Sequence, residues 1–238
     1  MAVESLYVEP DQPATEVEWP ALECLDVFKI FRSGPVETVA LRGLDMRVER
    51  GELIAVLGPS GCGKSTFLSL AAGLDEPSAG EVRAAGRSLG RLDEDELAAY
   101  RARGTAIVFQ SDNLWPALSA LENVVTGLRL AARADAEETA RAALSAFGLG
   151  GRESHRASAL SGGEQQRVAI AAAAARGARL VLADEPTGEL DEYNERLVLD
   201  ALGELRSKGA TVIVVTHSER VAAAVDRVIE MRDGRASS

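Results

Sequence analysis

The octapeptide Gly-Pro-Ser-Gly-Cys-Gly-Lys-Ser at positions 58–65 constrains the fold of this chain more than any other feature. A glycine, four variable residues and then Gly-Lys-Ser is the spacing of a phosphate-binding loop. Residues 52–57 before it form an apolar run typical of a strand buried on both faces. Residues 66–72 after it favour a helix that Gly73 ends. Strand, loop and helix in this order predict an α/β nucleotide-binding fold rather than an ordinary glycine-rich turn.

The chemistry of the loop assigns a role to its residues. Its glycines let backbone amides approach phosphate groups, and the following helix start adds the positive end of a dipole. Lys64 is expected to reach the β and γ phosphates of ATP, and the Ser65 hydroxyl to ligate Mg²⁺. Cys62 is interpreted as a small filler. The predicted nucleotide-binding residues are Gly58, Pro59, Ser60, Gly61, Cys62, Gly63, Lys64, Ser65 and Thr66.

A second buried strand is predicted at residues 179–183, and Asp184 and Glu185 follow it directly. Ligands of open α/β sheets bind just beyond the carboxyl ends of the strands. Adjacent side chains leave a strand in different directions, so Asp184 can serve a magnesium ion while Glu185 activates water. The alternative is a solvated acidic turn before Pro186. Burial of the preceding strand argues against that alternative.

Two more predicted strands end in polar residues at the same edge. Gln110 follows the apolar stretch 105–109, and His217 follows the stretch 211–216. Taken alone, each would more often be a turn residue, but four such strand ends meeting at one edge favour a shared site. His155, the only other histidine, lies in a polar stretch and is expected to be solvated.

Residues 160–167 read Leu-Ser-Gly-Gly-Glu-Gln-Gln-Arg and predict a helix that begins after Ser161. A helix start with small residues is a second potential phosphate site, although a simple helix cap would have the same composition. The chain thus carries two such helix starts but one complete catalytic set.

These motifs, in this order, resemble those of the ATP-binding subunits of ABC transporters, over roughly residues 21–235. The segment 184–191, Asp-Glu-Pro-Thr-Gly-Glu-Leu-Asp, is similar to the group of lipoprotein-releasing and macrolide-exporting ATPases, which usually has Asn where this chain has Glu189. The resemblance implies a P-loop NTPase of the ABC ATPase type. Its fold would be a mixed, mainly parallel core sheet with an antiparallel β subdomain and an inserted α-helical subdomain at about 112–175.

The resemblance also implies residue roles. Gln110 would sense magnesium and water, and with Ser65 and Asp184 complete the metal site. Glu185 would be the catalytic base and His217 the switch on the γ phosphate. Two copies would pack head to tail, so that Ser161, Gly162, Gly163 and Glu164 of one copy close over ATP held by the other. Asp191 would link the two sites. Phe31 would stack on adenine, although a strand-edge aromatic residue is an alternative interpretation.

Composition limits the remaining possibilities. A net charge of −11 argues against nucleic acid as the main partner. Two cysteines do not form a disulfide framework and suit a reducing cytosol. No apolar run is long enough to cross a bilayer, and no signal peptide is recognisable. We therefore expect a cytoplasmic protein, and the resemblance implies that it is peripheral on the inner face of the plasma membrane through a separate permease.

The organisation expected along the chain is an acidic, mobile extension at residues 1–20 followed by an ATPase domain at 21–235. Residues 22–50 predict an antiparallel sheet with a turn near 33–35. Helices are predicted at 93–103, 119–130 and 136–147.

Three functions remain open from the sequence. The first is an ATPase subunit, acting as a homodimer, that powers a permease which exports or extracts membrane-associated substrates. The second is an ATPase that transmits force to cell-wall hydrolases, as in the related cell-division complex. The third, a nucleotide-binding regulator without catalysis, conflicts with the presence of Lys64, Asp184, Glu185 and His217.

Overall fold

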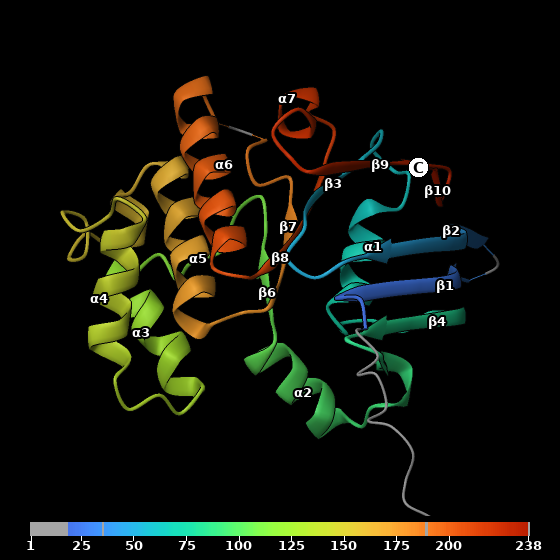
Figure 1. Ribbon diagram of the computed structural model, residues 1–238, viewed down its shortest axis with the longest axis horizontal. Helices are drawn as coiled ribbons and strands as arrows, with labels where there is room; N and C mark the ends of the chain where they lie inside the picture. The colour runs from blue at the N-terminus through green and yellow to red at the C-terminus, as the bar shows by residue number, and fades with distance from the viewer. Residues whose placement is uncertain (1–18, 35, 189, 238) are drawn as a thin grey trace, which may run out of the picture.

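The computed structural model describes residues 19–34, 36–188 and 190–237 (Figure 1). Its strands are β1 (Leu22–Ser33), β2 (Val36–Val48), β3 (Leu53–Leu57), β4 (Ala79–Ala84), β5 (Arg87–Ser88), β6 (Thr105–Val108), β7 (Leu180–Asp184), β8 (Thr211–Thr216), β9 (Arg227–Arg232) and β10 (Arg235–Ser237). Its α-helices are α1 (Lys64–Ala71), α2 (Glu94–Arg103), α3 (Ala120–Leu130), α4 (Ala136–Ala146), α5 (Gly162–Arg176), α6 (Glu192–Ser207) and α7 (Glu219–Ala222). Two short 3₁₀ helices, η1 (Leu89–Arg91) and η2 (Ala157–Ala159), complete the described elements.

The strands form two sheets. The central sheet has the order β10-β9-β3-β8-β7-β6, in which every neighbouring pair is parallel except β10 with β9. The second sheet, β2-β1-β4-β5, is antiparallel throughout. This is the predicted combination of a mainly parallel core sheet and an antiparallel subdomain. The carboxyl ends of β3, β6, β7 and β8 therefore lie at one edge of the central sheet, as expected.

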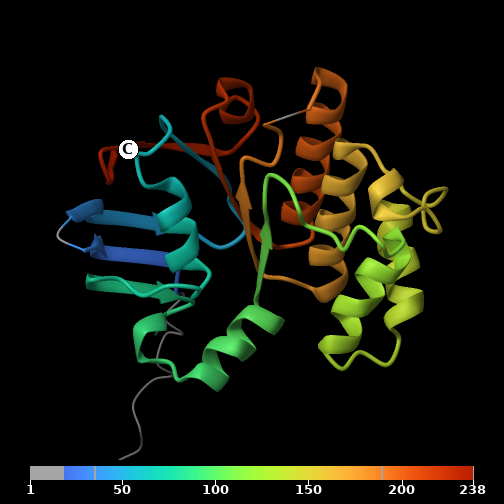
Figure 2. The ribbon, with the colours of Figure 1, turned by 180° about the vertical axis from the view of Figure 1, so that it is seen from behind.

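Alternating side chains of the central strands build two hydrophobic cores. On one face, residues such as Ile54 and Ile213 pack with α1 and with the antiparallel sheet. On the other, residues such as Val181 and Val212 pack with α5 and α6. The views from the two sides show the sheet standing between α1 with its antiparallel sheet and the helices α3–α6 (Figures 1 and 2). Burial on both faces explains why β3, β7 and β8 are continuous apolar runs.

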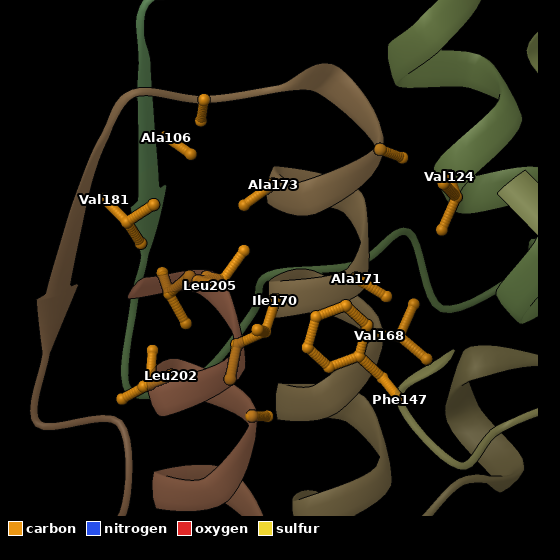
Figure 3. Packing of buried hydrophobic residues seen from close by; sticks show 14 of the residues in the cluster. Ala106, Val124, Phe147, Val168, Ile170, Ala171, Ala173, Val181, Leu202 and Leu205 are labelled. Atoms are coloured by element: carbon orange, nitrogen blue, oxygen red, sulfur yellow. The ribbon is translucent and has the colours of Figure 1, made fainter. Parts of the chain in front are cut away.

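The helical part is built around α5. Figure 3 shows α5 packed on two sides, toward β6, β7 and α6 on one and toward α3 and α4 on the other, through Ala106, Val124, Phe147, Val168, Ile170, Ala171, Ala173, Val181, Leu202 and Leu205. Capping boxes of Ser119 with Glu122 and of Ser161 with Glu164 fix the starts of α3 and α5. All three helices of this part, α3 to α5, lie within the predicted segment 112–175 or end one residue beyond it.

Several boundaries differ from the predictions by one or two residues. Helix α1 begins at Lys64 rather than at residue 66, because the phosphate loop turns directly into it, and β7 begins at Leu180. The predicted mobile extension lies outside the described residues up to position 18. Its last two residues belong to the folded part: Pro20 is buried, and the Trp19 carbonyl oxygen accepts a hydrogen bond from Arg50 Nε at 2.8 Å. None of the described helices combines the length and apolar character needed to cross a bilayer.

Candidate nucleotide site

The loop between β3 and α1 is shaped by glycines. Gly63 has φ 104°, in the left-handed region, and a Cβ there would lie 2.6 Å from the Ala40 carbonyl oxygen. A Cβ at Gly58 would lie 2.2 Å from the Met231 carbonyl oxygen. Both positions therefore exclude any side chain, and the loop can follow a path that leaves its tip open to a ligand. That tip, Pro59 to Gly61, is exposed.

Lys64 places a positive charge inside this loop. Its side chain is largely buried, and Nζ donates hydrogen bonds to the carbonyl oxygens of Gly58, at 2.7 Å, and Pro59, at 3.1 Å. The ammonium group thus lies within the curve of the loop at the start of α1, where the helix dipole also favours an anion. Cys62 is buried beneath the loop, consistent with its interpretation as a filler.

Asp184, the last residue of β7, lies close to the start of α1. Ser65, Lys64 and Glu185 are all close enough to act on the charge of its carboxylate. Burial raises the pKa of the Asp184 carboxyl above its ordinary value; the Ser65 hydrogen bond and the charge of Lys64 act in the opposite direction. Ser65 and Asp184 are therefore brought together as predicted, two oxygen donors beside the phosphate loop.

Glu185 is held in a defined orientation at the same edge. Its Oε2 accepts a hydrogen bond from Thr216 Oγ1 at 2.9 Å, and its Oε1 lies 2.9 Å from His217 Nδ1. The backbone of Glu185 has φ 43°, a left-handed conformation that a non-glycine residue adopts only at a cost. Side chains from the ends of β7 and β8 therefore form one network, as their order in the sheet predicted.

Gln110 lies at this edge, two residues after the end of β6. Its side-chain amide lies beside Gly188, where an added Cβ would be 3.1 Å from Nε2. Its backbone carbonyl oxygen accepts a hydrogen bond from Gln166 Nε2 at 2.6 Å. Gln166 Nε2 also donates to the Phe109 carbonyl oxygen, at 2.9 Å, and Asn113 Nδ2 donates to Gln166 Oε1 at 3.0 Å.

Gln166 and Asn113 were missed by the sequence analysis. Gln166 is 4% exposed and lies on the buried stripe of α5 with Gly163 and Ile170. A glutamine at the spacing of an apolar stripe was the available signal, because a buried amide requires hydrogen-bond partners.

The start of α5 faces other parts of the chain. Ser161 is the N-cap: its Oγ accepts from the Glu164 amide at 3.3 Å, and Glu164 Oε2 accepts from the Ser161 amide at 2.9 Å. Ser161 and Gly162 are exposed, whereas Gly163 packs so closely that a Cβ would lie 2.5 Å from Asn194 Oδ1. Within the described residues, this helix start packs on the start of α6, and Glu164 Oε1 accepts a hydrogen bond from Arg152 Nε at 2.7 Å; the phosphate loop is not among its partners.

Two further predicted residues lie on other elements. Asp191 is the N-cap of α6, with Oδ1 accepting from the Asn194 amide at 2.8 Å. Phe31 is 45% exposed on β1, and the ammonium group of Lys29 lies 5.1 Å from its ring centre. His155 is exposed, as expected.

The fold and the site define a P-loop nucleotide-binding protein with an inserted helical part. The chain belongs to the ABC transporter family, as an ATPase domain: the sequence profile described as "ABC transporter" matches residues 41–188.

The chain is similar to two kinds of transport ATPase. It is 46% identical over 218 residues to the macrolide export ATP-binding/permease protein MacB of Chromobacterium violaceum, covering 90% of this chain and 33% of that protein. It thus spans about a third of the length of such relatives. It is 46% identical over 226 residues to the lipoprotein-releasing system ATP-binding protein LolD of Anaeromyxobacter dehalogenans, covering 93% of this chain and 95% of that protein.

Among solved structures, the chain is similar to the ATP-binding cassette MJ0796 in a dimeric, post-hydrolysis state bound to ADP and Pi. The TM-score is 0.83 at 36% sequence identity, over 91% of this chain and 97% of that one. Another dimeric structure of MJ0796, described as a bacterial ABC transporter cassette, gives a TM-score of 0.84 at 37% identity. The predicted fold class and family are confirmed by these likenesses.

Proposed function

We propose that this chain hydrolyses ATP in a head-to-tail homodimer and thereby drives a separate membrane permease, which exports or extracts membrane-associated substrates. The observation that carries the proposal is the network at the carboxyl edge of the central sheet. There Asp184 lies beside Ser65 and Lys64, and Glu185 is held by Thr216 and His217.

ATP binding is assigned to residues 58–66, with backbone amides and Lys64 on the phosphates and Phe31 stacking on the adenine ring. The exposed face of Phe31 supports the stacking role. The donor set also fits Mg²⁺, which binds through one or two carboxylate or hydroxyl oxygens together with substrate phosphates and water. Ser65, Asp184 and Gln110 would hold the ion, whose charge would offset that of the phosphates during transfer.

Hydrolysis requires a water molecule aligned with the γ phosphate. Glu185 is the group we assign to polarise that water. An ionised carboxylate offers about four acceptor positions, so Glu185 can accept from Thr216 and His217 and still accept from water. Thr216 fixes one carboxylate oxygen, and His217 is placed to contact the γ phosphate from the end of β8. The left-handed backbone at Glu185 supports a functional role, because such strain is found at active sites.

The helix start at Ser161 supports the dimeric arrangement. In a single copy, α1 and α5 pack on opposite faces of the central sheet, so the exposed Ser161 and Gly162 are free to approach ATP bound by a second copy. We assign Ser161 to Glu164 to this contact and Asp191, which caps α6 next to them, to communication between the two sites. The dimeric state of the similar MJ0796 cassette supports the same arrangement.

The relatives MacB and LolD, by their names, serve macrolide export and lipoprotein release. Their similarity supports an exporter or extractor as the partner, and with it a position on the cytoplasmic face of the plasma membrane. The force-transmitting alternative would be favoured instead if the permease that co-purifies with this chain also carries cell-wall hydrolases.

The proposal is tested by Glu185→Gln. This change keeps the shape and the hydrogen bonds with Thr216 but removes the negative charge that polarises water, so we expect ATP turnover to fall at least about a hundredfold. ATP binding should persist, and the ATP-bound dimer should accumulate in light scattering. A variant that remains monomeric at saturating ATP and magnesium, or that hydrolyses ATP normally, would contradict the assignment.

A further inference from the structure

A cavity of about 650 Å³ lies at the amino ends of the central strands, at the opposite end of the sheet from the phosphate loop. Gly104, Leu180 and Thr211, at the starts of β6, β7 and β8, line it. The antiparallel sheet closes its other side through Ala21 and residues 84–87. Its volume is in the range of ordinary ligand pockets, and its walls are mostly alanine, glycine and leucine.

Charge distinguishes this cavity from the rest of a chain with net charge −11. Its lining holds Arg50, Arg87, Arg179 and Lys208 and, within the described residues, no carboxylate. Arg87 and Lys208 form ion pairs with Glu96 and Glu204, outside the cavity. Arg50 and Arg179 form no ion pair with any of the described residues. The cavity therefore offers apolar walls and two arginines open to an anionic occupant.

Trp19, the first described residue, lies beside this cavity. The indole ring of Trp19 packs on Gly86, where a Cβ would lie 2.5 Å from the ring. Arg50 Nε donates to the Trp19 carbonyl oxygen, and the Ala85 amide to that of Ala21, at 3.1 Å. Residue 18 is therefore attached close to the cavity, which places the preceding segment at high local concentration there.

Residues 1–18 have the complementary composition. They hold five carboxylates and no lysine or arginine, and the apolar triplet Leu6-Tyr7-Val8 lies between Glu4 and Glu9. Ten residues, 9–18, separate this triplet from Trp19, a reach of up to about 35 Å for an extended chain.

We propose that this acidic segment docks in the cavity of its own chain, with Leu6-Tyr7-Val8 against the apolar walls and Glu4 and Glu9 facing Arg50 and Arg179. Apolar burial supplies the affinity and the charges set the orientation. Docking would link the antiparallel sheet to the end of α5 and the start of β7, because both line the cavity.

Disulfide trapping in the full chain tests this docking. Tyr7→Cys is combined with Ala174→Cys, at a half-buried wall position of the cavity, or, as control, with Arg91→Cys, an exposed position four residues beyond Arg87 and outside the lining. Both native cysteines are buried and do not compete. We expect the intramolecular disulfide with Ala174→Cys to form at least about tenfold faster than that with Arg91→Cys, because docking raises the local concentration.

Charge reversal provides the second arm. Arg179→Glu should remove the preference for Ala174→Cys; Arg179, unlike Arg50, makes no side-chain hydrogen bond to the described residues. The reversal Arg129→Glu, on α3, should leave it unchanged. Equal trapping rates at the two positions, or a preference that survives Arg179→Glu, would overturn the proposal. A covalent dimer in place of the intramolecular product would overturn it as well, since the occupant would then be a second copy.

Discussion

At the scale of single residues, the burial of the Asp184 carboxylate lowers the stability of the folded state. Asp184 lies half-buried between Ser65 and Glu185, and burial raises its pKa. A carboxyl whose pKa is higher in the folded state than in the unfolded chain destabilises the fold wherever it is ionised. The penalty is absent below the ordinary carboxyl range, grows as the pH rises through it, and is complete above the raised pKa. A bound cation would relieve that penalty.

Asp184→Asn should therefore have opposite effects on stability and activity. It removes the buried charge, so we expect a higher unfolding temperature at pH 7 in the absence of nucleotide and magnesium, with the difference vanishing in acid. ATP turnover should fall at least about a hundredfold, because an amide is a weaker ligand for the cation than a carboxylate and carries no negative charge to balance it. Thermal unfolding followed by circular dichroism across pH, with steady-state ATPase assays, measures both. A lower unfolding temperature than wild type at pH 7 would contradict this account.

At the scale of elements, helix α5 carries the helix start at Ser161 and also holds the loop that contains Gln110. Gln166 Nε2 donates to the backbone carbonyl oxygens of Phe109 and Gln110, directly after β6. A displacement of α5 is thus transmitted to the Gln110 backbone through a buried amide. Gln165, its neighbour on the helix, donates instead to the carbonyl oxygens of Ala157 and Leu160.

Gln166→Met should separate positioning from stability. It nearly preserves volume but removes the donor to the Gln110 carbonyl oxygen and one acceptor of Asn113 Nδ2, whereas the Phe109 carbonyl oxygen keeps its hydrogen bond from Asn113 Nδ2. The loss should cost about 1–3 kcal/mol of unfolding free energy. We expect kcat for ATP hydrolysis to fall about tenfold or more, with little change in ATP affinity, because the phosphate loop is untouched.

Gln165→Met is the matched control, since it also removes two side-chain-to-backbone hydrogen bonds on α5. It should lower stability by a similar amount but reduce kcat less. If Gln166→Met loses stability while keeping the wild-type kcat, Gln166 is a structural residue only.

The difference between what was predicted and what was missed has a physical origin. The position of Lys64 at the start of α1 could be predicted because loop shape and helix start depend on residues adjacent in sequence. The grouping of Asp184, Glu185 and His217 followed from parallel strands ending at one edge. The apolar stripe of α5 indicated that the Gln166 amide is buried, but its partners could not be predicted, because the bond with Asn113 joins segments 53 residues apart. The packing of Trp19 on Gly86 likewise joins segments far apart in the sequence, so no local pattern predicts it.

At the scale of the whole molecule, two helix starts suited to phosphate lie on opposite sides of one sheet. The start of α1 carries Lys64, and the start of α5 carries Ser161. One chain cannot bring both to the same ATP without rebuilding its core, because α1 and α5 are packed in separate clusters on the two faces of the central sheet. Two chains in head-to-tail contact can do so at two sites.

Ser161→Arg tests this arrangement in the isolated subunit. The phosphate loop of the variant is intact, so ATP binding by the monomer should be nearly unchanged, whereas the arginine side chain should block the approach of the partner and abolish ATP-driven dimerisation and hydrolysis. Ser119→Arg is the matched control. It disrupts the equivalent capping box at the start of α3, at a cost of about 1 kcal/mol, but should leave dimerisation unaffected. Normal turnover by Ser161→Arg would overturn the head-to-tail dimer.

Mixing Ser161→Arg with Lys64→Ala makes the test specific for shared sites. Lys64→Ala alone should lose tight ATP binding, by at least about a hundredfold, because it removes the buried cation that faces the phosphates. A heterodimer of the two variants has one site with both defects and one in which Lys64 of the first chain meets Ser161 of the second. We therefore expect the mixture to recover part of the hydrolysis that neither variant shows alone, measured as phosphate release against total protein. Recovery requires that the two residues act across the dimer, since within one chain each variant lacks one of them.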